Sequence, residues 1–518
     1  MKTNIRYQWT LGMILAFCLA GISAYTQKIN YSEPEREDTR RTNFEIIGRV
    51  GGNFLVFKNN RGENDISVYD YNMKLLNRVH HTDPNDRWIN VDFVSYPDFA
   101  WMVYQLQRKN MVYCYAVKID GNGKRLTNPI ELDTTRIGWS ASNKIYSLIF
   151  SEDKQQIMLF KINNRDPSNF LITTLLFDPQ MQLRYKHHIG IPMEERNEYF
   201  TDFLIDNEGD FVFAKFVRRS GSDYTSDVVL VTKKSDQESF RQYPIPLQDQ
   251  YLDAINIKLD NSNRRIILNS FYYSQRRGHV DGLRYWIWGK DSLDLLVQRE
   301  LPFTEEMRKM AKGPDANLKS AFNDYIITKM ITRKDGGYIV VSEAAYTTSR
   351  GNVYDRWGNR LWNNPWLSPM DYYYWSPYYS PYSSFYWDRW NYGRGFQQGT
   401  RYHSENVFLM SFDLQGNLEW SNAIPKNQFD DESDALISHL VFVSGNELQL
   451  LFNLYERRNL LLNNQGVKPD GTINRYPTLK NLDRDIEFMP RFGKQVSTKV
   501  VIVPCLSRNT LIFAKIEF

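Results

Sequence analysis

The sequence predicts an all-β fold made of a repeated four-stranded unit, and three features lead to this prediction. A phrase recurs in which a strand-forming run ends in Asp, a turn with Gly or Asn follows, and a second strand-forming run begins, as in residues 411–420. A different phrase, as in residues 203–213, alternates with the first along the chain. Helical patterns are rare, and the clearest is a capping Thr304 followed by acidic residues, which predicts one short connector helix to about Ala311.

Each phrase predicts a β-hairpin because of its turn residues. Asp and Asn accept hydrogen bonds from the backbone that follows them, and Gly reaches positive φ without strain. Asp-Gly between two apolar runs is therefore a strong hairpin signal. Copies of the first phrase are centred on Asp70, Asp120, Asp178, Asp291, Asp413 and Asp470, and copies of the second on Asp206, Asp335 and Gly445. We expect these Asp residues to form turns rather than calcium sites, because residues 120–123 lack the complete EF-hand pattern.

Alternation of the two phrases at a spacing of about fifty residues is typical of propeller blades. We predict a β-propeller over residues 44–518, with about eight four-stranded blades and seven as the alternative. Two strand-forming runs, 499–503 and 510–516, precede the end of the chain, and no fourth strand follows them. A strand candidate at 27–31 is available to complete that last blade, so we expect an N-terminal strand to close the propeller.

The N-terminus resembles a secretory signal. A positively charged start and an apolar run from Trp9 to Ala20 precede small residues, and we place cleavage after Ala24. Residues 1–24 are therefore expected to be a signal peptide, with an uncleaved anchor as the alternative, and residues 25–43 a polar lead-in. No later segment is long and apolar enough to span a membrane. We expect an exported protein that is periplasmic, envelope-associated or extracellular.

Composition limits the functions that the chain can have. The net charge is only +4, and Lys and Arg do not cluster, which argues against a nucleic-acid partner. After signal removal only Cys114 and Cys505 remain, which excludes a disulfide scaffold. Both cysteines are expected to be small buried residues.

A segment rich in Tyr and Trp, residues 350–402, interrupts the repeat between the expected second and third strands of the sixth blade. Tyr and Trp offer large contact areas with a polar tip, which suits sugars and protein partners. The alternatives are a self-packed cap and mobile low-complexity sequence. If the segment is a binding platform, our candidate partner-binding residues are Tyr372, Tyr373, Tyr374, Trp375, Tyr378, Tyr379, Trp387 and Trp390.

Signatures of catalysis are missing from the sequence. It contains no Gly-x-Ser-x-Gly elbow, no His-Glu-x-x-His and no phosphate loop, so we predict no catalytic, metal-binding or cofactor-binding residues. The pairs His80-His81 and His187-His188 are expected to be loop residues at matching places in two blades rather than metal ligands. Carboxylates are plentiful, and a glycosidase pair among them stays open.

Together the repeat phrase, the signal and the aromatic segment resemble those of uncharacterised secreted bacterial proteins of the β-propeller type. The resemblance covers residues 44–518 and implies a scaffold or binding role in the cell envelope, with no catalytic residues to carry over. The sequence therefore predicts a non-enzymatic protein that recognises a protein or polysaccharide through loops of one propeller face. The alternative is a carboxylate-based hydrolase or lyase that acts on glycans.

Overall fold

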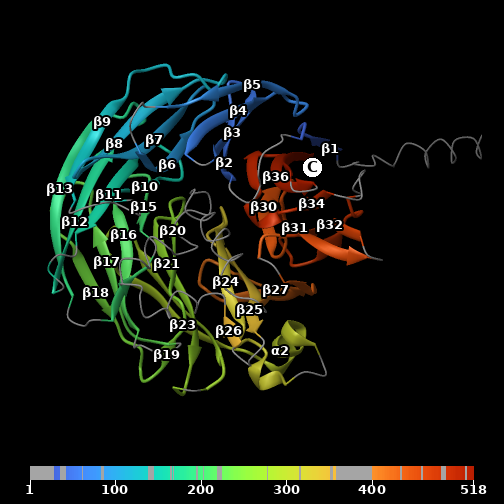
Figure 1. Ribbon diagram of the computed structural model, residues 1–518. Coiled ribbons are helices and arrows are strands. Elements are labelled where there is room, and N and C mark those ends of the chain that lie inside the picture. Colours follow the sequence, from blue (N-terminus) through green and yellow to red (C-terminus); the bar gives the residue numbers. More distant parts are fainter. Residues whose placement is uncertain are drawn as a thin grey trace, which may run out of the picture.

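The computed structural model shows an almost entirely β protein whose strands form repeated units (Figure 1). It describes residues 28–34, 42–60, 62–82, 87–137, 145–163, 166, 168–193, 197–201, 203–218, 224–276, 278–313, 317–349, 354–356, 400–431, 434–456, 459–479, 486–507 and 510–518. The expected signal peptide, residues 1–24, lies outside the described residues.

The first three units are separate four-stranded antiparallel sheets in simple sequence order. Their strands are β2 (Thr42–Val50), β3 (Asn53–Asn60), β4 (Glu63–Tyr69) and β5 (Leu75–His80); β6 (Arg87–Ser95), β7 (Ala100–Arg108), β8 (Met111–Ile119) and β9 (Ile130–Arg136); and β10 (Ser147–Phe150), β11 (Ile157–Asn163), β12 (Asn169–Phe177) and β13 (Leu183–Pro192).

The fourth and fifth units have a first strand in two pieces, and they are joined into one ten-stranded sheet because β19 pairs with both β17 and β21. Their strands are β14 (Glu198–Phe200), β15 (Leu204–Ile205), β16 (Phe211–Arg218), β17 (Thr225–Lys233) and β18 (Arg241–Ile245); and β19 (Tyr251–Leu252), β20 (Asn256–Asp260), β21 (Arg265–Tyr273), β22 (Gly282–Gly289) and β23 (Leu295–Pro302). The predicted connector helix follows as α2 (Glu305–Lys312), capped by the Thr304 side chain, and a 3₁₀ turn (Leu318–Ser320) comes after it.

The sixth, seventh and last units complete the chain. Their strands are β24 (Tyr325–Thr332), β25 (Tyr338–Ser349), β26 (Tyr354–Arg356), β27 (Thr400–Phe412), β28 (Leu418–Ile424) and β29 (Gln428–Asp430); β30 (His439–Ser444), β31 (Glu447–Glu456), β32 (Asn459–Val467) and β33 (Ile473–Arg475); and β34 (Ile486–Phe488), β35 (Lys494–Ser497), β36 (Val500–Ser507) and β37 (Thr510–Glu517), with a 3₁₀ turn (Pro490–Phe492) before β35.

The last unit takes its outermost strand from the other end of the chain. β1 (Lys28–Tyr31) pairs antiparallel with β37, as expected for the strand candidate at residues 27–31. Next to it, the Ser32 amide donates to the Phe513 carbonyl at 2.8 Å, and the Ser32 hydroxyl accepts from the Phe513 amide at 3.0 Å. The free edge that β37 would otherwise present is therefore covered.

Hydrophobic cores lie between neighbouring units rather than inside any one of them. For example, one cluster joins the first and second units, and another joins the fourth and fifth. The last and first units share a cluster too, in which the rings of Phe44 and Phe513 meet edge to face at 5.3 Å. In Figure 1 the units follow one another around a circle, with β2 near β36. The arrangement is propeller-like.

Burial follows from this stacking. An inner strand is covered on both faces by its neighbours, so β16 is buried along its whole length. An outermost strand such as β5 alternates between exposed and half-buried residues. His80, His187 and His188 lie in such outermost strands, β5 and β13, so their placement in loops was wrong.

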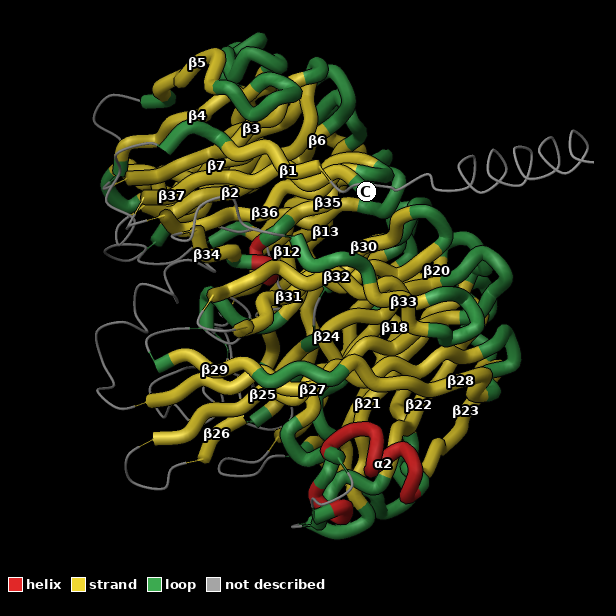
Figure 2. The backbone as a smooth tube through the Cα atoms, turned by 90° about the vertical axis from the view of Figure 1, so that its right-hand side faces the viewer, coloured by secondary structure: helices red, strands yellow, loops and turns green. Residues whose placement is uncertain are grey.

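The recurring phrases form hairpin turns, as predicted. The Asp70 carboxylate accepts from the amides of Asn72 and Lys74, both at 2.8 Å. The same pattern recurs at Asp120, Asp178 and Asp206. These turns connect first to second and third to fourth strands. We call the side of the molecule that carries them the turn face, and Figure 2 shows β20, β28 and β33 near it.

Most of the described turns between third and fourth strands are also tied to the unit before them. A side chain of the preceding unit donates a hydrogen bond to a backbone carbonyl of the turn, and we call this contact a latch. Examples run from His81 to Gly123, from Trp101 to Pro179, from Tyr285 to Gly416, from Trp420 to Pro469, and from Lys515 of the last unit to Tyr71 of the first.

Candidate functional site

The sixth unit departs most from the repeat, and it carries the aromatic segment. Its second and third strands, β25 and β27, are far longer than their counterparts. A register shift near Glu343 divides their pairing into a part inside the sheet and a part beyond it. Beyond the shift, residues 345–349 pair with 400–404, and β26 and β29 add one strand on each side. We call these four paired segments the ribbon.

The ribbon lies on the side of the molecule opposite the turn face, which we call the insertion face (Figure 2). Along the chain, the aromatic segment comes between β25 and β27, the second and third strands of the sixth unit. Near the two ends of the segment, 354–356 form β26 and 400–402 belong to β27. The eight candidate residues between Tyr372 and Trp390 lie outside the described residues.

One side of the ribbon is buried and polar groups line it. Ala345, Thr347, Tyr402, Ser404 and Gln428 are at most 5% exposed. They lie against Ile437 and against a group of buried charged side chains, described next. Because side chains alternate along a strand, the residues between them point to the opposite, outer side.

Beneath the ribbon, Glu343, Lys426 and His439 form a cluster that is almost wholly buried, and we call it the Glu343 cluster. The Glu343 carboxylate meets Lys426 Nζ at 2.7 Å and His439 Nδ1 at 2.8 Å. It also accepts from the hydroxyls of Ser404 and Ser438, each at 2.7 Å. The cluster thus fastens the ribbon to β25 below it and to β30 of the next unit.

The charges of this cluster compensate one another. Burial alone would raise the pKa of Glu343, but Lys426 and His439 outweigh it and hold the pKa below its ordinary value. Burial lowers the pKa of Lys426, and Glu343 opposes that shift. All three side chains are too deeply buried to meet a ligand, so the cluster positions the ribbon.

The outer side of the ribbon combines aromatic and charged groups. The rings of Tyr346 and His403, cross-strand partners, stack at 4.5 Å, and Phe429 follows at 6.5 Å from His403. Arg401 lies over the Phe429 ring at 4.6 Å and pairs with both oxygens of Asp431, at 2.6 and 3.0 Å. Phe429 is 52% exposed.

A second exposed ring lies on the neighbouring unit. Tyr455, at the end of β31, is 65% exposed. Partial burial and the carboxylates of Glu487 and Asp430 raise its pKa. β31 lies next to β29, because Gln428 donates to the carbonyl of Asn453, two residues before Tyr455, at 2.7 Å. We call Tyr346, Arg401, His403, Phe429, Asp431 and Tyr455 the ribbon-root surface. Exposed rings beside paired charges are suited to contact with a partner.

Two titratable groups on this surface are uncharged at neutral pH. The Tyr346 hydroxyl donates to Glu405 at 2.7 Å, and burial together with Glu405 raises its pKa. His403 Nε2 meets the Thr348 hydroxyl at 3.1 Å, and burial lowers the pKa of His403. His403 is therefore neutral at neutral pH.

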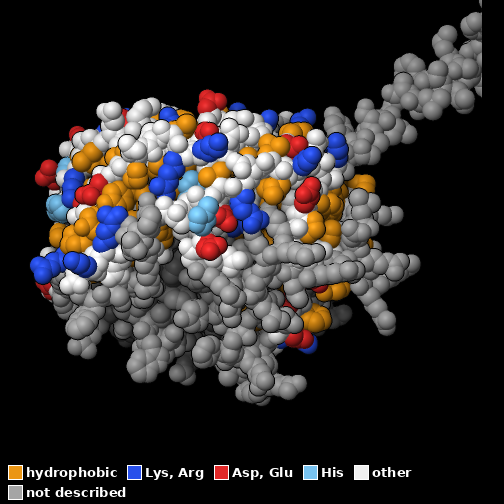
Figure 3. All heavy atoms as spheres, turned by 45° about the horizontal axis from the view of Figure 1, so that its top comes forward, with side chains coloured by type: hydrophobic (Ala, Val, Ile, Leu, Met, Phe, Trp, Pro, Cys, Tyr) orange, Lys and Arg blue, Asp and Glu red, His pale blue; other side chains and the backbone are white. Residues whose placement is uncertain are grey.

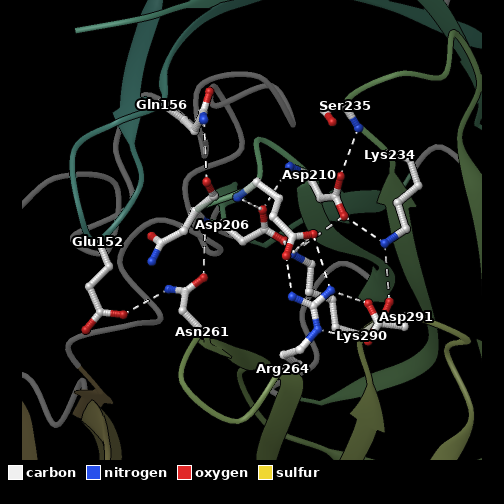
Figure 4. Close-up of polar contacts among 12 residues, drawn as sticks. Glu152, Gln156, Asp206, Asp210, Lys234, Ser235, Asn261, Arg264, Lys290 and Asp291 are labelled. Carbon is white, nitrogen blue, oxygen red and sulfur yellow. Dashed lines mark hydrogen bonds and ion pairs between the residues drawn. The ribbon is translucent and has the colours of Figure 1, made fainter.

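The densest charged network lies elsewhere, on the turn face between the third, fourth and fifth units (Figure 4). Lys290 contacts Asp206 at 2.6 Å and Glu208 at 2.8 Å, and Arg264 bridges Glu208 and Asp291. Arg264 and Lys290 lower the pKa of Glu208 to about 2. Each of these carboxylates has a cation beside it, so the network joins turns of adjacent units.

A cleft of about 550 Å³ opens beside α2, bordered by the loop between β21 and β22. Its one arginine, Arg308, is fully engaged, since its guanidinium donates to the carbonyls of Phe303, Val280, Asp281, Leu318 and Lys319. Arg308 therefore ties the helix to the sheet rather than offering charge to the cleft.

Metal and thiol chemistry have little support in the part of the chain that the structure describes. No three His, Cys, Asp or Glu side chains of that part are placed to share a metal ion. Cys114 and Cys505 are buried free thiols, as expected, and burial raises the pKa of both. Among the described helices, none is long and apolar enough to cross a membrane.

Exposed hydrophobic residues away from the ribbon are isolated. Leu76, Leu183 and Leu296 are each more than half exposed, but they lie on outermost strands of three different units. On the face in Figure 3, hydrophobic side chains lie among charged ones. Single exposed leucines of this kind are normal for a protein surface.

Sequence reasoning missed the ribbon-root surface because it assigned function to the middle of the aromatic segment. The signal was present at both borders. Residues 344–349 and 401–406 alternate small or buried types with Tyr, Thr, Arg, His and Glu, which is the pattern of a two-sided strand. His403 lies one residue beyond the predicted segment boundary, and Phe429 lies beyond β28.

Comparison with known proteins gives distant similarities only. No protein-family model and no curated protein matches the chain. Among solved structures, a prolyl endopeptidase aligns with a TM-score of 0.40 and 9% identity. The alignment covers 91% of this chain and 55% of the endopeptidase, so this chain spans little more than half of the endopeptidase's length. Polysaccharide lyase Uly1 aligns with a TM-score of 0.37 and 11% identity, over 87% of this chain and 91% of the lyase. An oligogalacturonate lyase in complex with manganese aligns with a TM-score of 0.35 and 11% identity, over 84% of this chain and 98% of the lyase. Similarities at these TM-scores assign no activity to this chain.

Proposed function

We propose that the protein is an exported, non-enzymatic binding or scaffold protein that recognises a protein or glycan partner of the cell envelope through its insertion face. One observation carries the proposal: the sixth unit extends a ribbon whose outer side exposes rings and paired charges, while its inner side is fixed by the Glu343 cluster. Rigidly held aromatic side chains are the usual anchors of recognition surfaces.

The scaffold in this proposal is a closed propeller of eight blades. The pairing of β1 with β37 and the core shared by the last and first units support closure. The latch from Lys515 to Tyr71 supports it as well, because it repeats between last and first units a contact made between other neighbours. Residues 1–24 are the signal peptide in this proposal, and Tyr372 to Trp390 extend the binding surface beyond the ribbon.

The test replaces residues 357–399 with a short Gly-Ser linker, which keeps all four paired segments of the ribbon. The parent and this variant are compared on a glycan array and in pull-downs from envelope extract. We expect the variant to keep the melting temperature of the parent and to lose binding. A linker variant that folds and keeps every ligand of the parent would contradict a role for the aromatic segment in binding. A Phe429→Ala protein that folds and keeps every ligand would contradict a role for the ribbon-root surface in binding.

A second candidate function is a glycan-acting hydrolase or lyase that uses carboxylates. The hydrogen bond between Tyr346 and Glu405, with the neutral His403 stacked on the same ring, favours it, because such groups move protons between donor and acceptor atoms. Turnover of any polysaccharide by the parent, lost in Glu405→Gln, would establish this candidate and overturn the non-enzymatic one.

A further inference from the structure

We infer that the ribbon-root surface binds a neutral, hydroxyl-rich glycan rather than a charged ligand. This inference rests on the proposed function and narrows its partner. The surface holds two kinds of group: exposed rings, and planar polar side chains whose charges are already paired. Each kind points to the same ligand chemistry.

The ribbon-root surface exposes aromatic rings that suit a sugar. Phe429 and Tyr455 are the two large exposed aromatic side chains here. Phe429 belongs to β29, and Tyr455 belongs to β31, which β29 contacts where Gln428 donates to the Asn453 carbonyl at 2.7 Å. Their exposure persists although the rest of the ribbon packs closely, with Ser404 and Gln428 buried beneath. An aromatic side chain provides a large apolar contact and, in Tyr, a polar tip, at small cost in conformational entropy. The C–H faces of a sugar ring are the complementary apolar surface.

The charged groups of the ribbon-root surface do not favour a charged ligand. Arg401 is held by both oxygens of Asp431 and lies against Phe429, so its charge is neutralised. His403 is neutral at neutral pH because burial lowers its pKa. The nearby carboxylates Glu405, Asp430 and Glu487 would repel a polyanion. They also have partners within the protein, which a cationic ligand would have to displace.

Hydrogen bonding then favours a glycan over an apolar ligand. The pair of Arg401 and Asp431 offers several donors and acceptors in one plane, and neutral His403 offers a ring nitrogen beyond the one bonded to Thr348. Adjacent hydroxyls of a sugar satisfy such groups without bringing a charge. A neutral ligand thus meets both kinds of group without breaking the ion pair.

The experiment measures binding of the full mature chain to neutral polysaccharides (β-glucan, mannan and galactan), to acidic polygalacturonate and to basic chitosan. Binding is compared at about 0.1 M and about 1 M salt, between which the Debye length falls from about 10 Å to about 3 Å. We expect affinity for at least one neutral glycan that changes less than about twofold with salt, because no net charge is exchanged.

The variants are Phe429→Ala and Tyr455→Ala, with Phe150→Ala as matched control because it removes an exposed ring, 42% accessible, from the third unit. We expect each ribbon-root variant to weaken binding about tenfold or more and the control to bind like the parent. Circular dichroism and melting temperatures confirm that all three variants fold.

The possible failures are distinguishable. Preference for polygalacturonate or chitosan, lost at high salt, overturns the neutral-glycan inference and leaves the proposed binding function in place. The same holds if the parent binds no glycan while Phe429→Ala loses a protein partner in the pull-down. If neither ribbon-root variant affects any ligand of the parent, the inference and this location for the proposed function both fail.

Discussion

The two faces of this molecule are built on opposite plans. On the turn face, the same Asp-centred turn recurs from unit to unit, and latches tie turns to the preceding unit. On the insertion face, the ribbon and the Glu343 cluster beneath it belong to the sixth unit and its border with the seventh. The repeated turns and latches hold neighbouring units together, whereas the ribbon departs from the repeat and forms a separate surface.

This contrast also divides the polar groups by role. The charges of the turn face neutralise one another between neighbouring units, as around Lys290, and thereby align the turns. Buried charges of the insertion face support a surface that still exposes Phe429 and Tyr455. The comparison predicts that changes to the repeat cost stability, and that changes to the outer side of the ribbon cost binding.

The largest effect should come from removing the strand that completes the repeat. Deletion of residues 25–34 leaves β37 with a free edge and removes the Ser32 bonds to Phe513. An unpaired edge is a template for pairing between chains, so we expect aggregation and earlier melting. Light scattering and thermal denaturation measure both. Melting equal to that of the parent would contradict closure of the ring by this strand.

The next largest effect should lie beneath the ribbon. Glu343→Ala leaves Lys426 buried without its carboxylate, and breaking a buried ion pair costs about 3–5 kcal/mol. We expect a matching loss in the free energy of unfolding, together with weaker ligand binding because the ribbon loses its support. Denaturant titration and the glycan assay measure these effects.

Two controls sharpen that result. Glu305→Gln breaks the exposed pair with Lys309 on α2 and should leave stability unchanged. The double variant Glu343→Leu with Lys426→Met should recover part of the loss, because Lys426 is then no longer buried without its carboxylate, whereas His439 still loses its partner. A Glu343→Ala protein as stable as the parent would mean that the cluster does not hold the ribbon.

The repeated plan was accessible from sequence because it is local. Asp at a turn needs only the next amides of its own chain, so copies such as Asp70 and Asp206 were identified from neighbouring residues alone. The pairing of β1 with β37 was predicted from a missing fourth strand, a property of the repeat. The latches were missed, since a bond such as that from Trp101 to Pro179 joins residues far apart in sequence.

The ribbon was harder to predict for the same physical reason. Glu343, Lys426 and His439 come from separate segments, and each looks like an ordinary polar residue until the fold brings them together. The aromatic segment attracted attention by composition, whereas the described surface at its root depends on cross-strand pairing of residues on either side of it. Composition drew attention to the sixth unit but not to these residues.

The third largest effect should come from replacing a glycine on the turn face. A pair of such variants distinguishes the cost of backbone strain from the cost of disturbed packing. Gly471 has φ +85°, and a Cβ there would lie 2.7 Å from the Trp420 ring of the preceding unit. Gly471→Ala should cost about 1–3 kcal/mol of stability from strain, plus the displacement of that ring. Gly445→Ala, at φ +60° with open space around it, is the matched control and should cost less. Equal losses in denaturant titrations would show that the close approach to Trp420 is unimportant.

The smallest effect concerns pH and the latch of the first unit. Burial, followed by the charge of Arg125, lowers the pKa of His81 to about 4, and Nε2 donates to the Gly123 carbonyl at 2.9 Å. The ordinary pKa is 6.5, so between pH 6.5 and pH 4 the unfolded chain binds more protons at this site than the folded one. The stability that this group contributes is therefore complete above pH 6.5 and falls as the pH drops toward 4.

We expect the melting temperature of His81→Gln, whose amide still reaches the turn, to fall less over that pH range than the melting temperature of the parent. Trp101→Phe removes a latch without a titratable group and should lower melting equally at every pH. If His81→Gln and the parent show the same pH dependence, the neutral histidine latch does not contribute to the pH dependence of stability.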